Sequence, residues 1–144
     1  MACLYLKKID LLNIYNKSNY FMPKLCINDY NFNDLDNCNN LTITELRIYA
    51  PNNINLLLDK LYKFTNLQIL FLSHNKITEI KGLDKLINLQ ELDLSNNKLT
   101  EIKGLDKLIN LQVLHLYNNK ITEIKRLDKL VNLQVLDLYC NKIT

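Results

Sequence analysis

LQILFLSHNKITEIKGLDKLIN, which begins at Leu67, is followed by LQELDLSNNKLTEIKGLDKLIN from Leu89, LQVLHLYNNKITEIKRLDKLVN from Leu111 and LQVLDLYCNKIT from Leu133. The period is 22 residues and does not slip. Self-similarity at this length is typical of a solenoid, in which each unit packs only on its neighbours. The repeat therefore predicts a stack of equivalent turns and not a globule built around a pocket.

Each unit follows the pattern L-x-x-L-x-L-x-x-N-x-[IL]. Leu70 and Leu72 alternate with variable neighbours, which is the period of a strand with one buried face. Between Ile77 and Leu86 an apolar residue recurs at every third position. That spacing indicates a tight return segment, extended or 3₁₀ in character, with one inward residue per turn. Stacking the units would bury all of these side chains in one continuous core.

The ninth position of every unit is asparagine. The chain must turn sharply after the strand, and this turn leaves backbone N–H and C=O groups pointing into the core. A carboxamide has both donors and acceptors, so an inward asparagine can satisfy them. The pattern predicts a structural asparagine ladder made of Asn75, Asn97, Asn119 and Asn141.

The four copies of this eleven-residue motif resemble the leucine-rich repeat family. The 22-residue length and the NxITxIxxLxxLxN return are similar to the subfamily that includes bacterial internalins and the phosphatase-regulating leucine-rich proteins of eukaryotes. The resemblance implies an α/β-type solenoid in which parallel strands line the concave face of an arc. It also implies short 3₁₀ or extended segments on the convex face, and partners that bind the concave side.

We divide the chain into regular repeats at 67–144 and a weaker version of the pattern at 1–66. The weaker part has strand positions at Leu25, Ile27, Leu46 and Ile48 and inward return positions at Leu58, Leu61 and Phe64. Pro51 stands where the asparagine belongs. Two interpretations stay open for residues 1–40: degenerate repeats, or a distinct N-terminal cap with a helix around 4–15.

The last unit stops at Thr144, and no polar capping element follows its strand and turn. Leu133, Leu136 and Leu138 would then lack a neighbour on one side. Repeat arrays normally need a polar cap for solubility, and an open strand edge invites pairing with another chain. Three explanations stay open: a truncated fragment, self-association through this end, or a frayed last strand.

Length, net charge and cysteine spacing limit the classes of function that the chain can have. The 144 residues suit one domain, and a net charge of +3 is too small to indicate nucleic-acid binding. No stretch is long enough to span a membrane. The four cysteines have no metal-type spacing, and the first fifteen residues lack the apolar core of a signal peptide. We expect a reducing, cytoplasmic location.

The candidate site lies where the units differ while the frame stays constant. Those positions are the outward residues of the strands, the third, fifth, seventh and eighth of each unit. We expect a protein partner to contact Arg47, Tyr49, Ile69, Phe71, Glu91, Asp93, His115, Tyr117, Asp137 and Tyr139.

Within this set, strand spacing of about 4.8 Å would place His115 between Asp93 and Asp137. Three interpretations compete: a solvated polar row, a recognition patch that responds to pH, and a metal site. Three ligands in a line on a flat face do not converge tetrahedrally, so we predict no metal.

The sequence favours a non-catalytic scaffold for protein–protein interaction. No Ser-His-Asp or Cys-His arrangement follows from the columns, and the two glycines form no phosphate-binding loop, so we expect no enzyme and no cofactor. The alternative is a regulatory or adaptor subunit of an enzyme complex such as a phosphatase, which the family resemblance allows.

Overall fold

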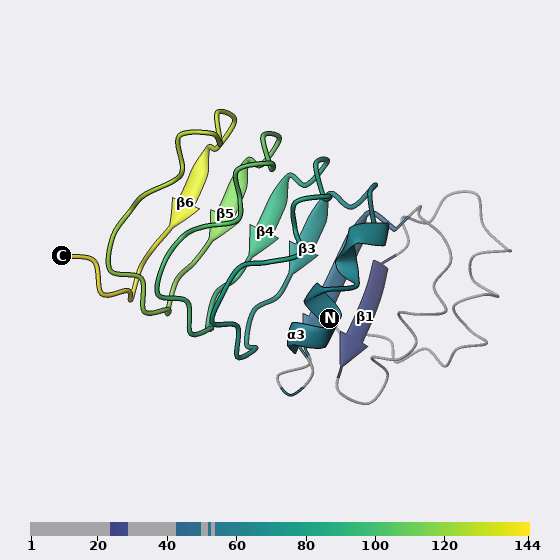
Figure 1. Ribbon diagram of the computed structural model, residues 1–144, viewed down its shortest axis with the longest axis horizontal. Helices are drawn as coiled ribbons and strands as arrows, with labels where there is room; N and C mark the ends of the chain where they lie inside the picture. Colours follow the sequence, from purple (N-terminus) through teal and green to yellow (C-terminus); the bar gives the residue numbers. More distant parts are fainter. Residues whose placement is uncertain (1–23, 29–42, 50–51, 53) are drawn as a thin grey trace, which may run out of the picture.

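The computed structural model describes residues 24–28, 43–49, 52 and 54–144, and its strands lie side by side in one row (Figure 1). Within these residues one parallel sheet has the strand order of the chain. The strands are β1 (Lys24–Asn28), β2 (Glu45–Tyr49), β3 (Ile69–Phe71), β4 (Glu91–Asp93), β5 (Val113–His115) and β6 (Val135–Asp137). The predicted solenoid of stacked parallel strands is confirmed.

The sheet register pairs residues that are 22 positions apart in the sequence. Leu70 pairs with Leu92, Leu92 pairs with Leu114, and Leu114 pairs with Leu136. The first three of these leucines are fully buried, whereas their strand neighbours Ile69 and Phe71 are half-buried. One face of β3, β4 and β5 therefore packs into the core, and the side chains of the other face point away from it.

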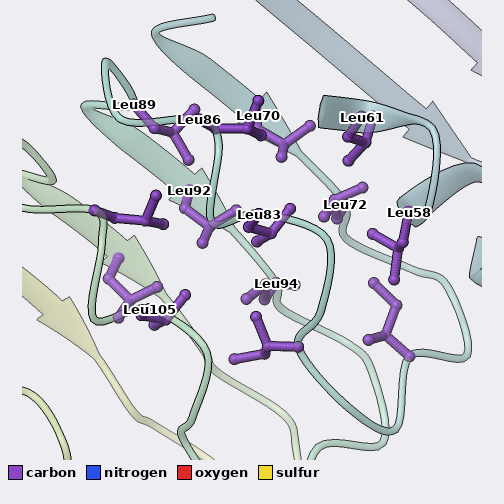
Figure 2. Close-up of a cluster of buried hydrophobic side chains, with 14 of the residues drawn as sticks. Leu58, Leu61, Leu70, Leu72, Leu83, Leu86, Leu89, Leu92, Leu94 and Leu105 are labelled. Atoms are coloured by element: carbon purple, nitrogen blue, oxygen red, sulfur yellow. The ribbon is translucent and has the colours of Figure 1, made fainter. Parts of the chain in front are cut away.

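The return segments supply the second wall of the core. Leu86 N–H donates to the Leu83 carbonyl at 2.9 Å, and Leu89 N–H donates to the Leu86 carbonyl at 3.0 Å. These three-residue steps are the tight coil that the spacing predicted. Figure 2 shows leucines from strands and returns meeting between the two walls. Full burial of each leucine contributes roughly 1.5–3 kcal/mol.

The return after β2 differs from the others. It contains a short α-helix, α3 (Ile54–Leu58), and a 3₁₀ turn, η1 (Leu61–Lys63). The inward positions predicted there are buried, but the helix was not predicted. Its signal was present, because apolar residues recur at helical spacing and all are buried: Ile54, Leu57, Leu58 and Leu61. Neither α3 nor any other helix in the described part of the chain has the length and apolar character to cross a membrane.

Further toward the N-terminus, β1 pairs with β2 through five residues, including Leu25 with Leu46 and Ile27 with Ile48. The strand positions marked in the sequence thus lie in a strand. The helix considered for residues 4–15 lies outside the described residues, as does Pro51. The choice between degenerate repeats and a cap therefore stays open.

The β6 end of the core is less covered than its interior. Leu136 is 36% exposed, whereas Leu114 in the same phase is 0% exposed. On the return side Ile124 is 52% exposed, whereas Ile102 is 2% exposed. Self-association through this end stays a prediction.

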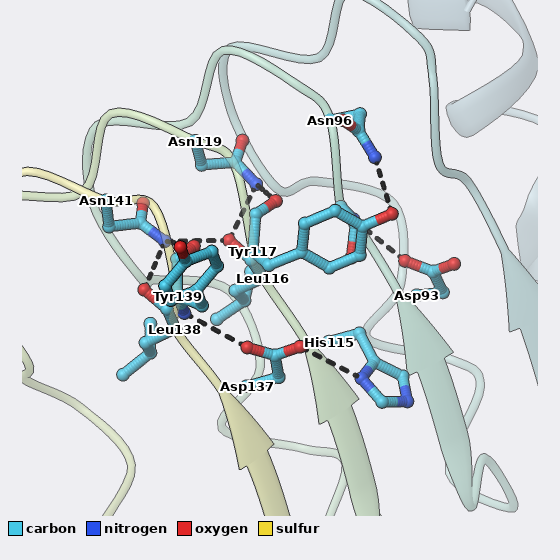
Figure 3. A network of polar contacts seen from close by, with 11 residues as sticks. Asp93, Asn96, His115, Leu116, Tyr117, Asn119, Asp137, Leu138, Tyr139 and Asn141 are labelled. Atoms are coloured by element: carbon cyan, nitrogen blue, oxygen red, sulfur yellow. Dashed lines mark hydrogen bonds and ion pairs between the residues drawn. The ribbon is translucent and has the colours of Figure 1, made fainter.

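Buried carboxamides join each turn to the one before it. Asn97 Nδ2 donates to the Leu94 carbonyl of its own turn at 2.9 Å and to the Leu72 carbonyl of the preceding turn at 3.0 Å. Its Oδ1 accepts from Ile77 N–H at 3.0 Å. Asn119 and Asn141 repeat this arrangement one and two turns later, and Figure 3 shows the Nδ2 bonds of Asn141 to the Leu138 and Leu116 carbonyls.

A second asparagine row, which the sequence analysis missed, closes each unit. Asn88 Nδ2 donates to the Thr65 carbonyl at 2.9 Å, Asn110 Nδ2 to the Ile87 carbonyl at 2.9 Å, and Asn132 Nδ2 to the Ile109 carbonyl at 2.8 Å. These side chains are exposed. The row joins turns at the surface, where water can replace a lost bond.

Truncating an asparagine side chain should lower the free energy of unfolding by different amounts in the two rows. We expect Asn97→Ala to lower the free energy of unfolding by about 1–3 kcal/mol, because buried backbone groups lose their partners. Asn110→Ala is the matched control in the exposed row and should cost less than about 1 kcal/mol. Urea denaturation of both variants and the wild type measures the difference. Equal losses would contradict the role assigned to the buried row.

Left-handed backbone recurs at two positions of the unit. The eighth position has φ between 53° and 57° at His74, Asn96, Asn118 and Cys140. The sixteenth position has φ of 72° at Gly82, 79° at Gly104 and 63° at Arg126. A Cβ on Gly104 would lie 2.6 Å from the Ile80 carbonyl oxygen, so glycine also permits the close approach of the preceding turn. Arg126 adopts the same conformation although it has a side chain.

The difference between Arg126 and Gly104 suggests two variants, one that introduces glycine at this position and one that removes it. Arg126→Gly should raise the free energy of unfolding by roughly 0.5–1 kcal/mol, because a residue with a Cβ is strained at positive φ. Gly104→Ala should lower it by more than about 1 kcal/mol, because the new methyl group also meets a backbone oxygen. Thermal unfolding of the two variants tests this. A destabilised Arg126→Gly would show that the arginine contributes a contact that outweighs the strain.

Candidate protein-interaction face

The outward side chains of the strands form two straight columns. The sheet register pairs Glu45 with Ile69, and the third-position column continues as Glu91, Val113 and Val135. The fifth-position column is Arg47, Phe71, Asp93, His115 and Asp137. Neighbours in a column are one strand spacing apart, about 4.8 Å. The side chains that differ between units thus lie together on one face.

The end of this face at β2 and β3 is a cluster of one ion pair and one aromatic ring. Arg47 Nε donates to Glu45 Oε1 at 2.9 Å, and the Arg47 guanidinium lies 3.9 Å from the centroid of the Phe71 ring. The Glu45 side chain is only 7% exposed, whereas that of Arg47 is 49% exposed. Stacking and pairing hold the guanidinium in place while leaving part of it accessible.

The acidic residues of the fifth column hold the turns that follow their own strands. Asp93 Oδ1 accepts from Ser95 N–H at 2.9 Å, and Asp137 Oδ1 accepts from Tyr139 N–H at 3.0 Å. His115 Nδ1 lies 4.0 Å from Asp137 Oδ2, and no pairing of His115 with Asp93 within 4.0 Å occurs among the described residues (Figure 3). The histidine was expected between two equivalent carboxylates. It faces one of them more closely.

The three tyrosines of the seventh position have different surroundings. Tyr49 is 60% exposed and Tyr139 is 77% exposed. Tyr117 is half-buried, and its hydroxyl accepts from Asn96 Nδ2 at 2.8 Å, so its ring reaches back over the preceding turn (Figure 3). Ser95, the seventh residue of that turn, is fully buried, and its Oγ has no partner among the described residues. Tyr117 is therefore part of the frame as well as part of the face.

The eighth position belongs to the turn. Its left-handed backbone explains why Asn96 and Asn118 are favoured there, since asparagine tolerates this conformation. Asn118 Nδ2 donates to Asn96 Oδ1 at 2.7 Å, and Asn96 Nδ2 lies 3.3 Å from His74 Nε2. This short polar row fixes the edge of the face.

Along another edge the structure has a groove that sequence reasoning did not find. We call it the amide groove. It has a volume of about 790 Å³ and is lined by Thr44, Asn66, Gln68, Asn88, Gln90, Asn110, Gln112 and Asn132. The signal was in the repeat itself, because the second and last positions of successive units are glutamine and asparagine.

The return side bears lysines interleaved with acidic residues, and some of them form ion pairs with one another. Lys103 Nζ lies 2.7 Å from Glu101 Oε1 and 3.6 Å from Glu79 Oε1, and Lys125 Nζ lies 2.7 Å from Glu123 Oε2. The hydrogen bond from Lys103 lowers the pKa of Glu101, and the same bond raises the pKa of Lys103. These exposed pairs fit a solvated face better than a basic stripe. Among the described residues, no three His, Cys, Asp or Glu side chains gather as a metal site.

Comparison with known proteins identifies the family to which this architecture is similar. The family model described as Leucine Rich repeats (2 copies) matches residues 65–107 and 109–144, together more than half of the chain. A search of curated proteins returned no match.

Three solved structures are similar. Internalin C2 of Listeria monocytogenes is 32% identical with a TM-score of 0.61, over 74% of this chain and 56% of that one. Internalin InlF of the same organism is 27% identical with a TM-score of 0.59, over 72% and 31%. A leucine-rich repeat protein of Leptospira interrogans is 34% identical with a TM-score of 0.60, over 72% and 28%.

This chain spans between about a quarter and just over half the length of these three proteins. The matches are to internalins and to another leucine-rich repeat protein, so they support the repeat architecture without choosing a subfamily. The fold, the asparagine rows and the family model agree: the chain belongs to the leucine-rich repeat family.

Proposed function

We propose that the protein is a non-catalytic scaffold that binds a protein partner across the outward face of β2–β6. Leucine-rich repeat proteins generally act as protein-interaction scaffolds. One observation carries the proposal for this chain: in the units from Leu67 onward, the side chains that differ most from unit to unit are held in register on one face, while the core and the return keep nearly the same residues. When recognition of a partner selects the side chains, the differences between units are expected to gather on the face that contacts the partner.

The face offers the residue types that dominate protein interfaces. Tyrosine, phenylalanine and arginine are enriched among interface residues that contribute most of the binding energy. Tyr49 and Tyr139 are largely exposed at the two ends of the face, and the Arg47–Phe71 pair lies next to Tyr49 along β2 and β3. The Arg47 guanidinium is already held by Glu45 and the Phe71 ring, so it loses little side-chain freedom on binding.

The charges of the face favour a partner with a basic surface toward β4–β6. Glu91, Asp93 and Asp137 lie in the two columns there, and His115 is the one basic side chain among them in those columns. Asp93 uses Oδ1 for its turn, which leaves Oδ2 available, whereas Asp137 Oδ2 already lies 4.0 Å from His115 Nδ1. Electrostatic complementarity of this kind sets the orientation and the rate of association.

A matched pair of double variants tests the proposal. The variant Tyr49→Ser, Tyr139→Ser removes two exposed side chains of the face. The control Tyr62→Ser, Ile109→Ser removes two from the return side, where Tyr62 is 61% and Ile109 is 52% exposed. In affinity capture with quantitative mass spectrometry, partners of the wild type should fall at least about tenfold with the first variant. The control should retain them.

The same experiment separates the alternatives. Equal capture by the wild type and the first variant would contradict binding through this face, and so would loss of the partners from the control alone. A phosphatase catalytic subunit in the wild-type set would favour the adaptor hypothesis over a simple scaffold. The cytoplasmic location stays a prediction, which the compartment of the captured partner would test.

A further inference from the structure

The amide groove is built from different residues than the proposed protein-interaction face, although its glutamines directly precede third-position residues of that face in the chain. Its lining comes from the second and last positions of the units, whereas the face comes from the third, fifth and seventh. Seven of the eight lining residues are asparagine or glutamine, and the eighth is threonine. The groove therefore has many hydrogen-bonding groups and no formal charge.

The two rows of carboxamides have different roles. The Nδ2 atoms of Asn88, Asn110 and Asn132 are held by backbone carbonyls, which fixes these side chains and leaves their Oδ1 atoms as acceptors. Gln90 and Gln112 are exposed, and their side chains make no hydrogen bond to the described residues. Each glutamine can give one donor and one acceptor to the same ligand group. A fixed row of asparagine side chains, which offer acceptors, thus runs beside a row of glutamine side chains, which offer both donors and acceptors.

Neutrality excludes the charged polymers. Nucleic-acid binding depends on lysine and arginine at the phosphates, and none lines the groove. Acidic or basic peptides would likewise find no opposite charge. Proline-rich peptides dock in grooves lined by aromatic rings, and no aromatic residue lines this one. An uncharged ligand rich in hydroxyl groups matches the lining.

The period of the rows selects the shape of that ligand. The carboxamides repeat with the strand spacing, about 4.8 Å. An extended peptide laid along the rows would present same-side residues every 6.6–6.8 Å or so, and it would lose register within two units. In a straight β-1,4-linked pyranose chain successive sugars are turned over, so the same hydroxyls recur at every second sugar, close to two strand spacings. Each sugar offers neighbouring hydroxyls that can both donate and accept.

We propose that the amide groove binds an extended, uncharged β-linked glycan, with successive sugars on successive repeats. Gln68, Gln90 and Gln112 contact the hydroxyls, and the Oδ1 atoms of the asparagine row accept from them. The site spans the turns from β2 to β5 and is independent of the protein partner.

An NMR titration tests the site, with cellohexaose, a straight β-linked glucose oligomer, as the probe. The side-chain amide signals of Gln90 and Gln112 should shift on addition. The variant Gln90→Ala, Gln112→Ala should weaken binding by at least about tenfold, because each carboxamide supplies two hydrogen bonds. Gln134→Ala is the matched control at the end of the row: Gln134 has the same phase but does not line the groove, so it meets only a sugar that extends past the site. It should bind as the wild type does.

Two further ligands make the result decisive. Maltohexaose, the coiled α-linked isomer, should bind more weakly than cellohexaose, and decaproline should leave the glutamine signals unchanged. The proposal is overturned if cellohexaose does not shift these signals, if the double variant binds as tightly as the wild type, or if maltohexaose or decaproline binds as well as cellohexaose. Circular dichroism of the variants shows that they keep the fold.

Discussion

A sharp turn after each of the strands β3 to β6 leaves buried backbone groups that a side chain must satisfy, and this requirement organises the regular repeats. The asparagine at the ninth position meets it by bonding to its own turn and to the preceding turn at once. A single inserted residue would move that carboxamide away from both sets of partners. The period of 22 residues is therefore held by hydrogen bonding as much as by the leucine core.

Once the period is fixed, the position of a residue within its unit determines which residues surround it. The same phase that buries Leu92 also buries Leu70 and Leu114, and the next phase places Phe71, Asp93 and His115 in one column. The frame can therefore remain constant while the face changes, because outward residues contribute little to the core. Two faces follow from the same frame: a varied one with aromatic and charged residues, and an unvaried one with carboxamides.

The sequence predicted the columns and the return because both depend only on phase. It missed α3, since the unit containing it departs from the 22-residue period, although the helical spacing of Ile54, Leu57 and Leu58 was visible. It also missed the exposed asparagine row, which recurs as regularly as the buried one. The reach of Tyr117 to Asn96 and the approach of His115 to Asp137 depend on side-chain rotamers, and periodicity carries no information about rotamers.

Amide hydrogen exchange tests the organising role of the buried asparagines most directly. The N–H groups of Ile77, Leu99 and Ile121 donate to the Oδ1 atoms of Asn97, Asn119 and Asn141. The account predicts that the Ile77 and Leu99 amides exchange only through large-scale opening, orders of magnitude more slowly than the neighbouring amides of Thr78 and Thr100. Exchange of Ile77 and Leu99 as fast as that of these threonines would contradict it.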